Sequence, residues 1–261
     1  MAFRQLSTMA AFVLSLSVGF TVPAQAQSIQ VAQTDTIAVI NQLSRQAAAL
    51  HQQGRHSEAA SLMVQYLDIC RQQFGNQHSC ATAGMHNLAD IYRALGRYEE
   101  AETLLLQVLA IKVEQQNESD ASFADSLNTL AATYYFQERY TEAEPLYRRA
   151  LAIRRQQLGE RHVRVATTLG NLAKLYQAQQ RYDEAELLFL QAIDIEKEQL
   201  GERHPYVAED MSFLGNIYRS QGRFAEAESL LRQAIDIRQE HFGVQHPSIA
   251  TNLNDLGMVY S

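Results

Sequence analysis

Residues 166–193 read ATTLGNLAKLYQAQQRYDEAELLFLQAI and contain two helical patterns separated by a break. Small and apolar residues recur at three- and four-residue intervals over 166–176, which is the spacing of one face of an α-helix. After the polar run at 179–181 the same spacing resumes over 185–193. The stretch therefore predicts two antiparallel helices, called helix A and helix B below, joined by a tight turn.

The same unit recurs when the chain is shifted by 42 residues. Four columns of identical residues hold this register without a slip: Tyr92, Tyr134, Tyr176, Tyr218 and Tyr260; Leu88, Leu130, Leu172, Leu214 and Leu256; Ala59, Ala101, Ala143, Ala185 and Ala227; Ile69, Ile111, Ile153, Ile195 and Ile237. One hairpin cannot bury its second face alone, so successive hairpins must stack. We expect an all-α fold, a right-handed superhelical solenoid of antiparallel helix pairs, with about five and a half repeats over residues 36–261.

The residues of one unit resemble a known repeat. The order Leu169, Leu172-Ala173, Tyr176, Ala185, Phe189 and Ala192 is similar to the tetratricopeptide repeat consensus. The 42-residue period and the phrases GRFAEAESLLRQAIDI (222–237) and HPSIATNLNDLG (246–257) resemble the longer repeats of kinesin light chains. The resemblance implies binding of an extended peptide along a concave face lined by helix A. It leaves the partner open, because such repeats serve many unrelated partners.

The motif LGERH, at 158–162 and 200–204, has the residue types of an acid–base site. Its histidine falls in a column directly before helix A, and prolines, which favour the first helical position, follow it twice. Histidines one repeat apart are roughly 10 Å apart, too far for a zinc ion with bonds of about 2 Å. We therefore predict that this column supplies the N-caps of helix A and holds no metal site. Its members are Thr36, His78, Asp120, His162, His204 and His246.

The turns carry their own signals. Gly159, Gly201 and Gly243 are expected to end helix B. A positive φ is expected in the A–B turn, where glycine occupies positions 54, 96 and 222, and Glu138 and Gln180 replace it. For helix B we expect the N-caps Ser57, Thr141 and Asp183.

The first residues have the anatomy of a secretory signal peptide. Arg4 precedes an apolar run over 9–22, and Ala24-Gln25-Ala26 is a small-x-small cleavage site. An uncleaved anchor is the alternative, disfavoured because the run is short and rich in Ser and Thr. We expect a signal peptide over 1–26, a flexible linker over 27–35, and an exported protein, periplasmic or secreted, with no membrane insertion after cleavage.

Export would place the two cysteines in an oxidising compartment. Cys70 and Cys80 lie symmetrically about Gly75, at the bend between two antiparallel helices. We expect a disulfide between them, with two unpaired thiols as the alternative.

Motifs of catalysis are missing from the sequence. It contains no HExxH, no GxSxG, no phosphate-binding glycine loop and no pair of histidines with a carboxylate, so we expect neither an enzyme nor a cofactor. The formal charge of −7 is repelled by nucleic acid phosphates and anionic lipids, so a nucleic acid partner is not expected.

The core columns set the phase of helix A and predict its groove. If Leu172 and Tyr176 point inward, the polar residues beside them line the groove, and amides suit an extended backbone because they both donate and accept. On the outer face of helix B we place Glu184, Glu196 and Lys197. The predicted groove residues are Asn87, Arg93, Asn128, Tyr135, Asn171, Lys174, Asn216, Arg219 and Asn254.

Two functions fit these observations. The first is a non-enzymatic, exported scaffold that binds a protein or peptide in the groove. The alternative is an amino-terminal regulatory or recognition module of a truncated larger exported protein, such as one with a protease or signalling domain. The sequence stops at 257–261, after one helix of a sixth repeat, which favours a partner, a homodimer through that helix, or a truncated gene.

Overall fold

The computed structural model describes residues 24–244 and 246–260, with side chains from residue 36 onward. Within these ranges there are eleven helices and no strand. The helices are α1 (Ala24–Gln52), α2 (His56–Phe74), α3 (Ser79–Ala94), α4 (Tyr98–Glu114), α5 (Ala121–Phe136), α6 (Tyr140–Leu158), α7 (Val163–Ala178), α8 (Tyr182–Leu200), α9 (Pro205–Ser220), α10 (Phe224–Phe242) and α11 (Pro247–Gly257).

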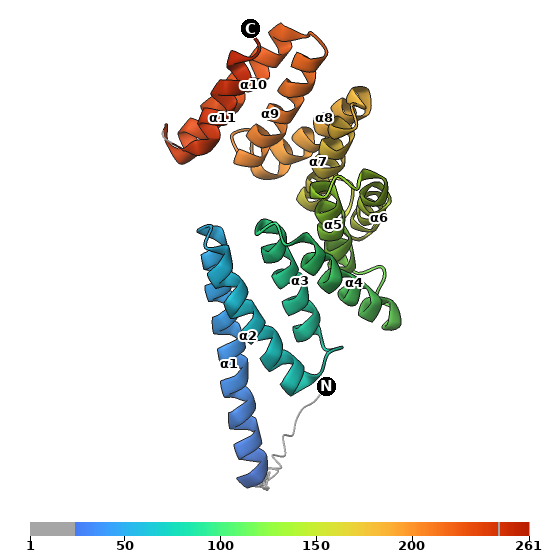
Figure 1. Cartoon of the computed structure of the whole chain (residues 1–261), viewed down its shortest axis with the longest axis vertical. Helices are drawn as coiled ribbons and strands as arrows, with labels where there is room; N and C mark the ends of the chain where they lie inside the picture. The colour runs from blue at the N-terminus through green and yellow to red at the C-terminus, as the bar shows by residue number, and fades with distance from the viewer. Residues whose placement is uncertain (1–23, 245, 261) are drawn as a thin grey trace, which may run out of the picture.

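Every helix packs against the next one in the chain, which is the contact pattern of stacked hairpins. Odd-numbered helices are helix A and even-numbered helices are helix B. The A helices of neighbouring hairpins also touch, α3 with α5, α5 with α7 and α7 with α9. Figure 1 shows the hairpins stepping along a curved path, and these contacts place the A helices on its inner side. The predicted all-α solenoid is confirmed.

The alanine columns explain how closely the helices approach. Ala143, Ala185 and Ala227 have no exposed surface, so helix B lies directly on helix A at these points. Large side chains, among them Phe189 and Leu231, fill the space on either side and are also fully buried. Small and large residues at fixed positions therefore repeat the same packing along the array, and the buried residues form four core clusters.

The turn from helix B to helix A needs glycine. Gly75, Gly159, Gly201 and Gly243 have φ of 80–94° and ψ of 153–164°, a region that only glycine occupies readily. Asn117 stands in this column between α4 and α5, where α4 ends early and Gln116 takes a φ of 58°. The A–B turn is less demanding, because Glu138 and Gln180 adopt the left-handed φ of 59–60° predicted for them.

The predicted N-caps of helix A are confirmed for the four histidines and wrong for Thr36, and those of helix B are wrong. Each of the four column histidines accepts a hydrogen bond from the backbone N–H two residues later, at 3.1–3.3 Å. Asp120 is at the N-cap without a side-chain bond, and Thr36 lies inside α1. The N-cap of helix B is an arginine two residues before the predicted Ser57, Thr141 and Asp183, because the arginine binds a glutamate in the first turn instead.

The start of the array is a longer helix than expected. α1 begins at Ala24, so residues 27–35, for which we expected a flexible linker, are helical. The segment has no glycine or proline, and its three glutamines and Ala32 favour a helix. The signal-peptide prediction falls mostly on residues 1–23, which lie outside the described residues, and stays a prediction.

The cap arginines also tie one hairpin to the hairpin before it. The guanidinium of Arg181 lies 3.8 Å from the ring centre of Tyr176 and donates to Glu144 of the preceding helix B at 2.9 Å. The Tyr176 hydroxyl donates to the same carboxylate at 3.0 Å. We call this arrangement the turn ladder, and it recurs as Tyr134, Arg139 and Glu102, and as Tyr218, Arg223 and Glu186.

Candidate functional site

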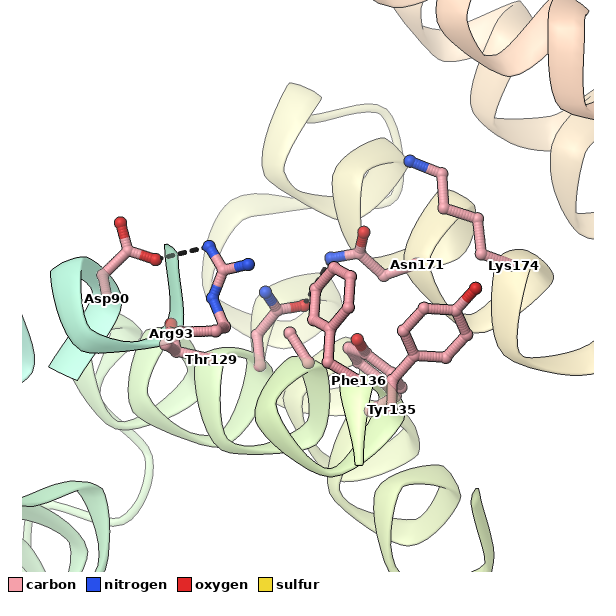
Figure 2. A pocket seen from close by; sticks show the side chains of 10 residues that line it. Asp90, Arg93, Thr129, Tyr135, Phe136, Asn171 and Lys174 are labelled. Carbon is pink, nitrogen blue, oxygen red and sulfur yellow. Dashed lines mark hydrogen bonds and ion pairs between the residues drawn. The ribbon is translucent and has the colours of Figure 1, made fainter. Parts of the chain in front are cut away.

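The inner face holds a cavity where three successive A helices meet. We call it the central pocket; its volume is about 260 Å³, and Figure 2 shows its lining. α3, α5 and α7 supply most of the lining residues, and α6 adds one. The lining residues are Asp90, Arg93, Asn128, Thr129, Ala132, Tyr135, Phe136, Tyr147, Asn171 and Lys174.

Polar groups of the central pocket are held in place by one another. Arg93 donates to Asp90 at 2.6 Å, and its buried Nε has no hydrogen-bond partner among the described residues. The side-chain amide of Asn171 donates to the amide oxygen of Asn128, one repeat earlier, at 3.3 Å. In Figure 2, Arg93 and Asn171 lie along the same cavity, which Asn128 also lines. The pocket therefore offers a cation and fixed amides to a chain lying across the A helices.

Aromatic rings make the other side of the central pocket. Phe136 is half exposed, and the guanidinium of Arg93 lies 5.7 Å from the centre of its ring. Tyr147 is buried below, and burial raises the pKa of both Tyr147 and Tyr135, so these phenols stay neutral and keep their protons. Exposed aromatic surface beside fixed polar groups is typical of a peptide-binding site.

A second cavity, of about 160 Å³, adjoins the first and shares Asn171 and Lys174 with it. We call it the acidic pocket, because three of its lining residues, Glu196, Glu209 and Asp210, carry carboxyl groups. The other lining residues are Thr167, Gly170, Asn171, Lys174 and Tyr206. Lys174 donates to Glu209 at 2.6 Å. Glu196 and Asp210 are only 3% and 5% exposed. Burial raises the pKa of both, and the charge of Asp210 adds to the effect on Glu196.

A third cavity of about 280 Å³ lies between the second and third repeats. His86 and Asn87 of α3 face Lys112 of α4 and Asp125 of α5 across it. Burial lowers the pKa of His86, which keeps the imidazole neutral at pH 7. This cavity continues the polar character of the inner face towards the first repeat.

The structure gathers most of the predicted groove residues. Arg93, Asn128, Tyr135, Asn171 and Lys174 line the central pocket, and Asn87 lines the third cavity. Asn216, Arg219 and Asn254 lie outside these cavities. Asn216 donates to Asp255 of α11 at 3.1 Å, Arg219 is half-buried and Asn254 is exposed.

The prediction for Glu196 was wrong. We placed it on the outer face of helix B, but it is buried against α9, with its side chain in the acidic pocket. Asp210, its neighbour, was not among the predicted residues, nor were Phe136 and Tyr147. The 42-residue columns contain a signal for the pair, because Glu196 stands where Arg154 and Arg238 stand in the repeats on either side.

LGERH joins successive repeats in the described structure. Its histidine caps the next helix, as described above, and its arginine reaches the next helix B. Arg161 donates to Asp194 at 2.6 Å and also binds Glu198, and Arg203 binds Glu240. Across the described residues, no group of three His, Cys, Asp or Glu side chains is placed to hold a metal ion.

Cys70 and Cys80 are joined as a disulfide between α2 and α3, with their Cα atoms 5.6 Å apart. Cys70 is completely buried in the core of the first repeats. Their oxidation state in the exported protein remains a prediction. Within the described residues, no helix has both the length and the hydropathy that a membrane span requires.

Comparisons with known proteins agree with this architecture. Family models of the tetratricopeptide repeat match residues 39–112, 122–198 and 211–248. Among solved structures, a Podosopora anserina protein described as a kinesin light chain with nearly identical TPR-like repeats is 28% identical (TM-score 0.63), over 77% of this chain and 95% of its own. BtubC (BKLC) from P. vanneervenii is 27% identical (TM-score 0.69), over 85% of this chain and 89% of its own.

A more distant structure shares the fold alone. The apo form of the quorum sensor NprR from B. thuringiensis is 16% identical with a TM-score of 0.66, over 86% of this chain and 58% of its own. Among curated proteins no sequence match was found.

Proposed function

The chain belongs to the tetratricopeptide repeat family, in its kinesin light chain-like form, and from that premise we propose that it is a scaffold that binds an extended peptide segment along its inner face. Proteins built on this repeat are typically non-enzymatic scaffolds for protein interaction. The central pocket is the observation that carries the proposal, because it brings amides, a cation and aromatic rings from three successive A helices to one surface. A segment lying across the A helices would meet the three cavities in turn.

The linked amides give the sharpest test of the site. Asn128 and Asn171 bond each other, so replacing both with alanine leaves neither with an unpaired partner and should leave folding intact. A random peptide library displayed on phage is selected against the full exported chain, and the affinities of the enriched peptides are measured by calorimetry. We expect the double variant to bind them more weakly by about 1–3 kcal/mol for each hydrogen bond lost.

The matched control lies on helix B. Leu187 and Leu190 of α8 are exposed, at 62% and 46%, and replacing both with alanine should leave affinity unchanged. The opposite pattern, with affinity lost in the α8 variant and kept in the Asn128→Ala/Asn171→Ala variant, would place partners on the outer surface and contradict the proposal.

We also propose that the protein is exported, to the periplasm or out of the cell. The pattern of Arg4, the apolar run and Ala24-Gln25-Ala26 supports this, as does a disulfide between Cys70 and Cys80, since disulfides persist in oxidising compartments. Amino-terminal sequencing of the protein from its native host should give Gln27 as the first residue. A retained Met1 would contradict export.

A further inference from the structure

One position of helix B meets the following helix A at every junction between hairpins. It is Cys70 at the first junction, and at three of the other four it is a cation, Lys112, Arg154 or Arg238. Arg154 of α6 donates to Thr168 of α7 at 2.5 Å and to Asp125 at 2.7 Å. Arg238 of α10 donates to Asn252 of α11 in the same way. Lys112 of α4, in the same column, donates to Ser122 of α5 at 2.7 Å. At each of these three junctions the cationic side chain is buried or half-buried and is hydrogen-bonded to a side chain of the following helix A.

At the junction of α8 and α9 the charge is reversed. Glu196 occupies the arginine column, and Asp210 occupies the column of Thr168 and Asn252. Both carboxylates are more than nine-tenths buried, and Glu196 Oε2 has no hydrogen-bond partner among the described residues. Lys174, the cation of this pocket, is held by the third carboxylate, Glu209. The site therefore holds two buried carboxyl groups for which the surrounding side chains supply no cation of their own.

The pocket around these carboxylates is open to the groove. A methyl group at position 170 would come within 2.8 Å of Asp210 Oδ2, so Gly170 is what lets this carboxylate lie against α7. Asn171 and Lys174 line both the acidic pocket and the central pocket, so the two cavities adjoin on the inner face. Tyr206, half exposed, adds an aromatic ring to the pocket.

We propose that the acidic pocket receives a lysine or arginine side chain of the bound peptide, a specificity site that rests on the peptide-binding function proposed above. A long cationic side chain fits because its donors can reach Glu196 and Asp210 while its apolar stem lies on Tyr206. The cationic side chain of the peptide would take the place that Arg154 and Arg238 occupy at the two neighbouring junctions. A metal ion is a poorer occupant, because within the described residues no group of three His, Cys, Asp or Glu side chains is placed to hold one.

The chain itself provides the variant that tests this. Glu196→Arg with Asp210→Asn copies the junction formed by Arg238 and Asn252, so it should fold, with its own arginine filling the site. Asp68→Arg with Asp236→Asn makes the same change in formal charge at exposed positions of α2 and α10 and serves as the control. If circular dichroism shows that the first variant is unfolded, the isosteric pair Glu196→Gln and Asp210→Asn replaces it.

Peptides selected on the unmodified chain are expected to carry a lysine or arginine at one fixed position. Replacing that residue by citrulline, or by norleucine for lysine, should weaken binding by at least about ten-fold. The Glu196→Arg/Asp210→Asn variant should lose the same factor for the basic peptide and nothing for its neutral counterpart, while the control variant binds both as the parent chain does. Equal affinities for basic and neutral peptides that still require Asn128 and Asn171 would overturn the specificity site and leave the peptide-binding function standing.

A second arm tests the pocket without a peptide. N-acetyl-L-arginine amide and N-acetyl-L-citrulline amide are titrated into the full chain and followed by NMR. Binding of the arginine amide alone, abolished in Glu196→Arg/Asp210→Asn, is the expected result. It would support the cation pocket even if no peptide were selected, in which case the peptide-binding function alone would fail. No preference for the arginine amide overturns the cation pocket.

Discussion

The junction of α6 with α7 is the third in the array and that of α8 with α9 is the fourth, and the two bury side chains of opposite formal charge. Between α6 and α7, Arg154 satisfies Thr168 and Asp125; between α8 and α9, Glu196 lies near Asp210 with an oxygen unpaired. Both junctions stack because the alanine and leucine columns are the same in each. Packing alone therefore does not decide which charge stands in this column. The third junction uses the position for stability, whereas in our proposal the fourth gives up stability for recognition of a partner.

Making the third junction resemble the fourth should have the largest effect. Arg154→Glu removes three hydrogen bonds and places a carboxylate beside Asp125, so we expect a loss of about 3–5 kcal/mol in the free energy of unfolding. Urea denaturation measures it, with the exposed Gln156→Glu of the same helix as control. A loss no greater than that of the control would mean that the buried arginine does not stabilise its junction.

The first junction has a covalent bond in the same column, because Cys70 is its first member. Opening the disulfide by Cys70→Ala with Cys80→Ala should lower the free energy of unfolding by about 2–3 kcal/mol in the chain-entropy model. Urea denaturation of the purified exported chain gives the value. Peptide mapping without reducing agent is the companion measurement, and two free thiols in exported material would contradict the assignment.

The fourth junction should respond to pH where the third does not. Burial raises the pKa of Glu196 to about 8 and of Asp210 to about 7, with Lys174 and Glu209 as the other charges facing them. The folded state therefore holds protons that the unfolded chain has lost, and stability falls as pH rises from about 4 to about 8.

Glu196→Gln with Asp210→Asn should remove this fall, raising the free energy of unfolding by about 1–3 kcal/mol at pH 8 and by little at pH 4. Thermal and urea denaturation across this range decide the matter. Parallel pH profiles for the parent chain and the variant would show that the pair is not titrating in the folded state.

The smallest effect should come from the cap beside the acidic pocket. His204→Ala removes a single bond to the backbone N–H of Tyr206 and should lower the free energy of unfolding by about 0.5–2 kcal/mol, as His162→Ala should at the third junction. Peptide affinity should not change. Loss of affinity with an unchanged melting temperature would give LGERH a role in binding after all.

The repeat made the fold predictable from the sequence. The features that the sequence did not predict lie where one repeat differs from the others or where a contact overrides a local preference. Columns such as Tyr176 and Ala185 are apolar, so their periodicity predicts burial directly. Glu196 could not be placed in the same way, because a glutamate in an amphipathic helix is usually solvated and the charge alone does not reveal a buried position. The predicted caps Ser57, Thr141 and Asp183 failed for a related reason: intrinsic preference favoured them, but an arginine two residues earlier was bound by a glutamate and a tyrosine.

The turn ladder has a consequence for how the array bends. At three successive junctions its tyrosine, arginine and glutamate tie a hairpin to the preceding one through the same contacts, which restrict bending of the inner face there. The first junction cannot form the ladder, because Ala60 stands where Glu102, Glu144 and Glu186 stand, and it is there that Cys70 and Cys80 are joined. A covalent bond thus supplies the rigidity that an ionic contact supplies elsewhere. Reduction of the disulfide would therefore let the first hairpin, α1 and α2, change its orientation relative to the second hairpin. The inner face from α3 onward would keep its shape.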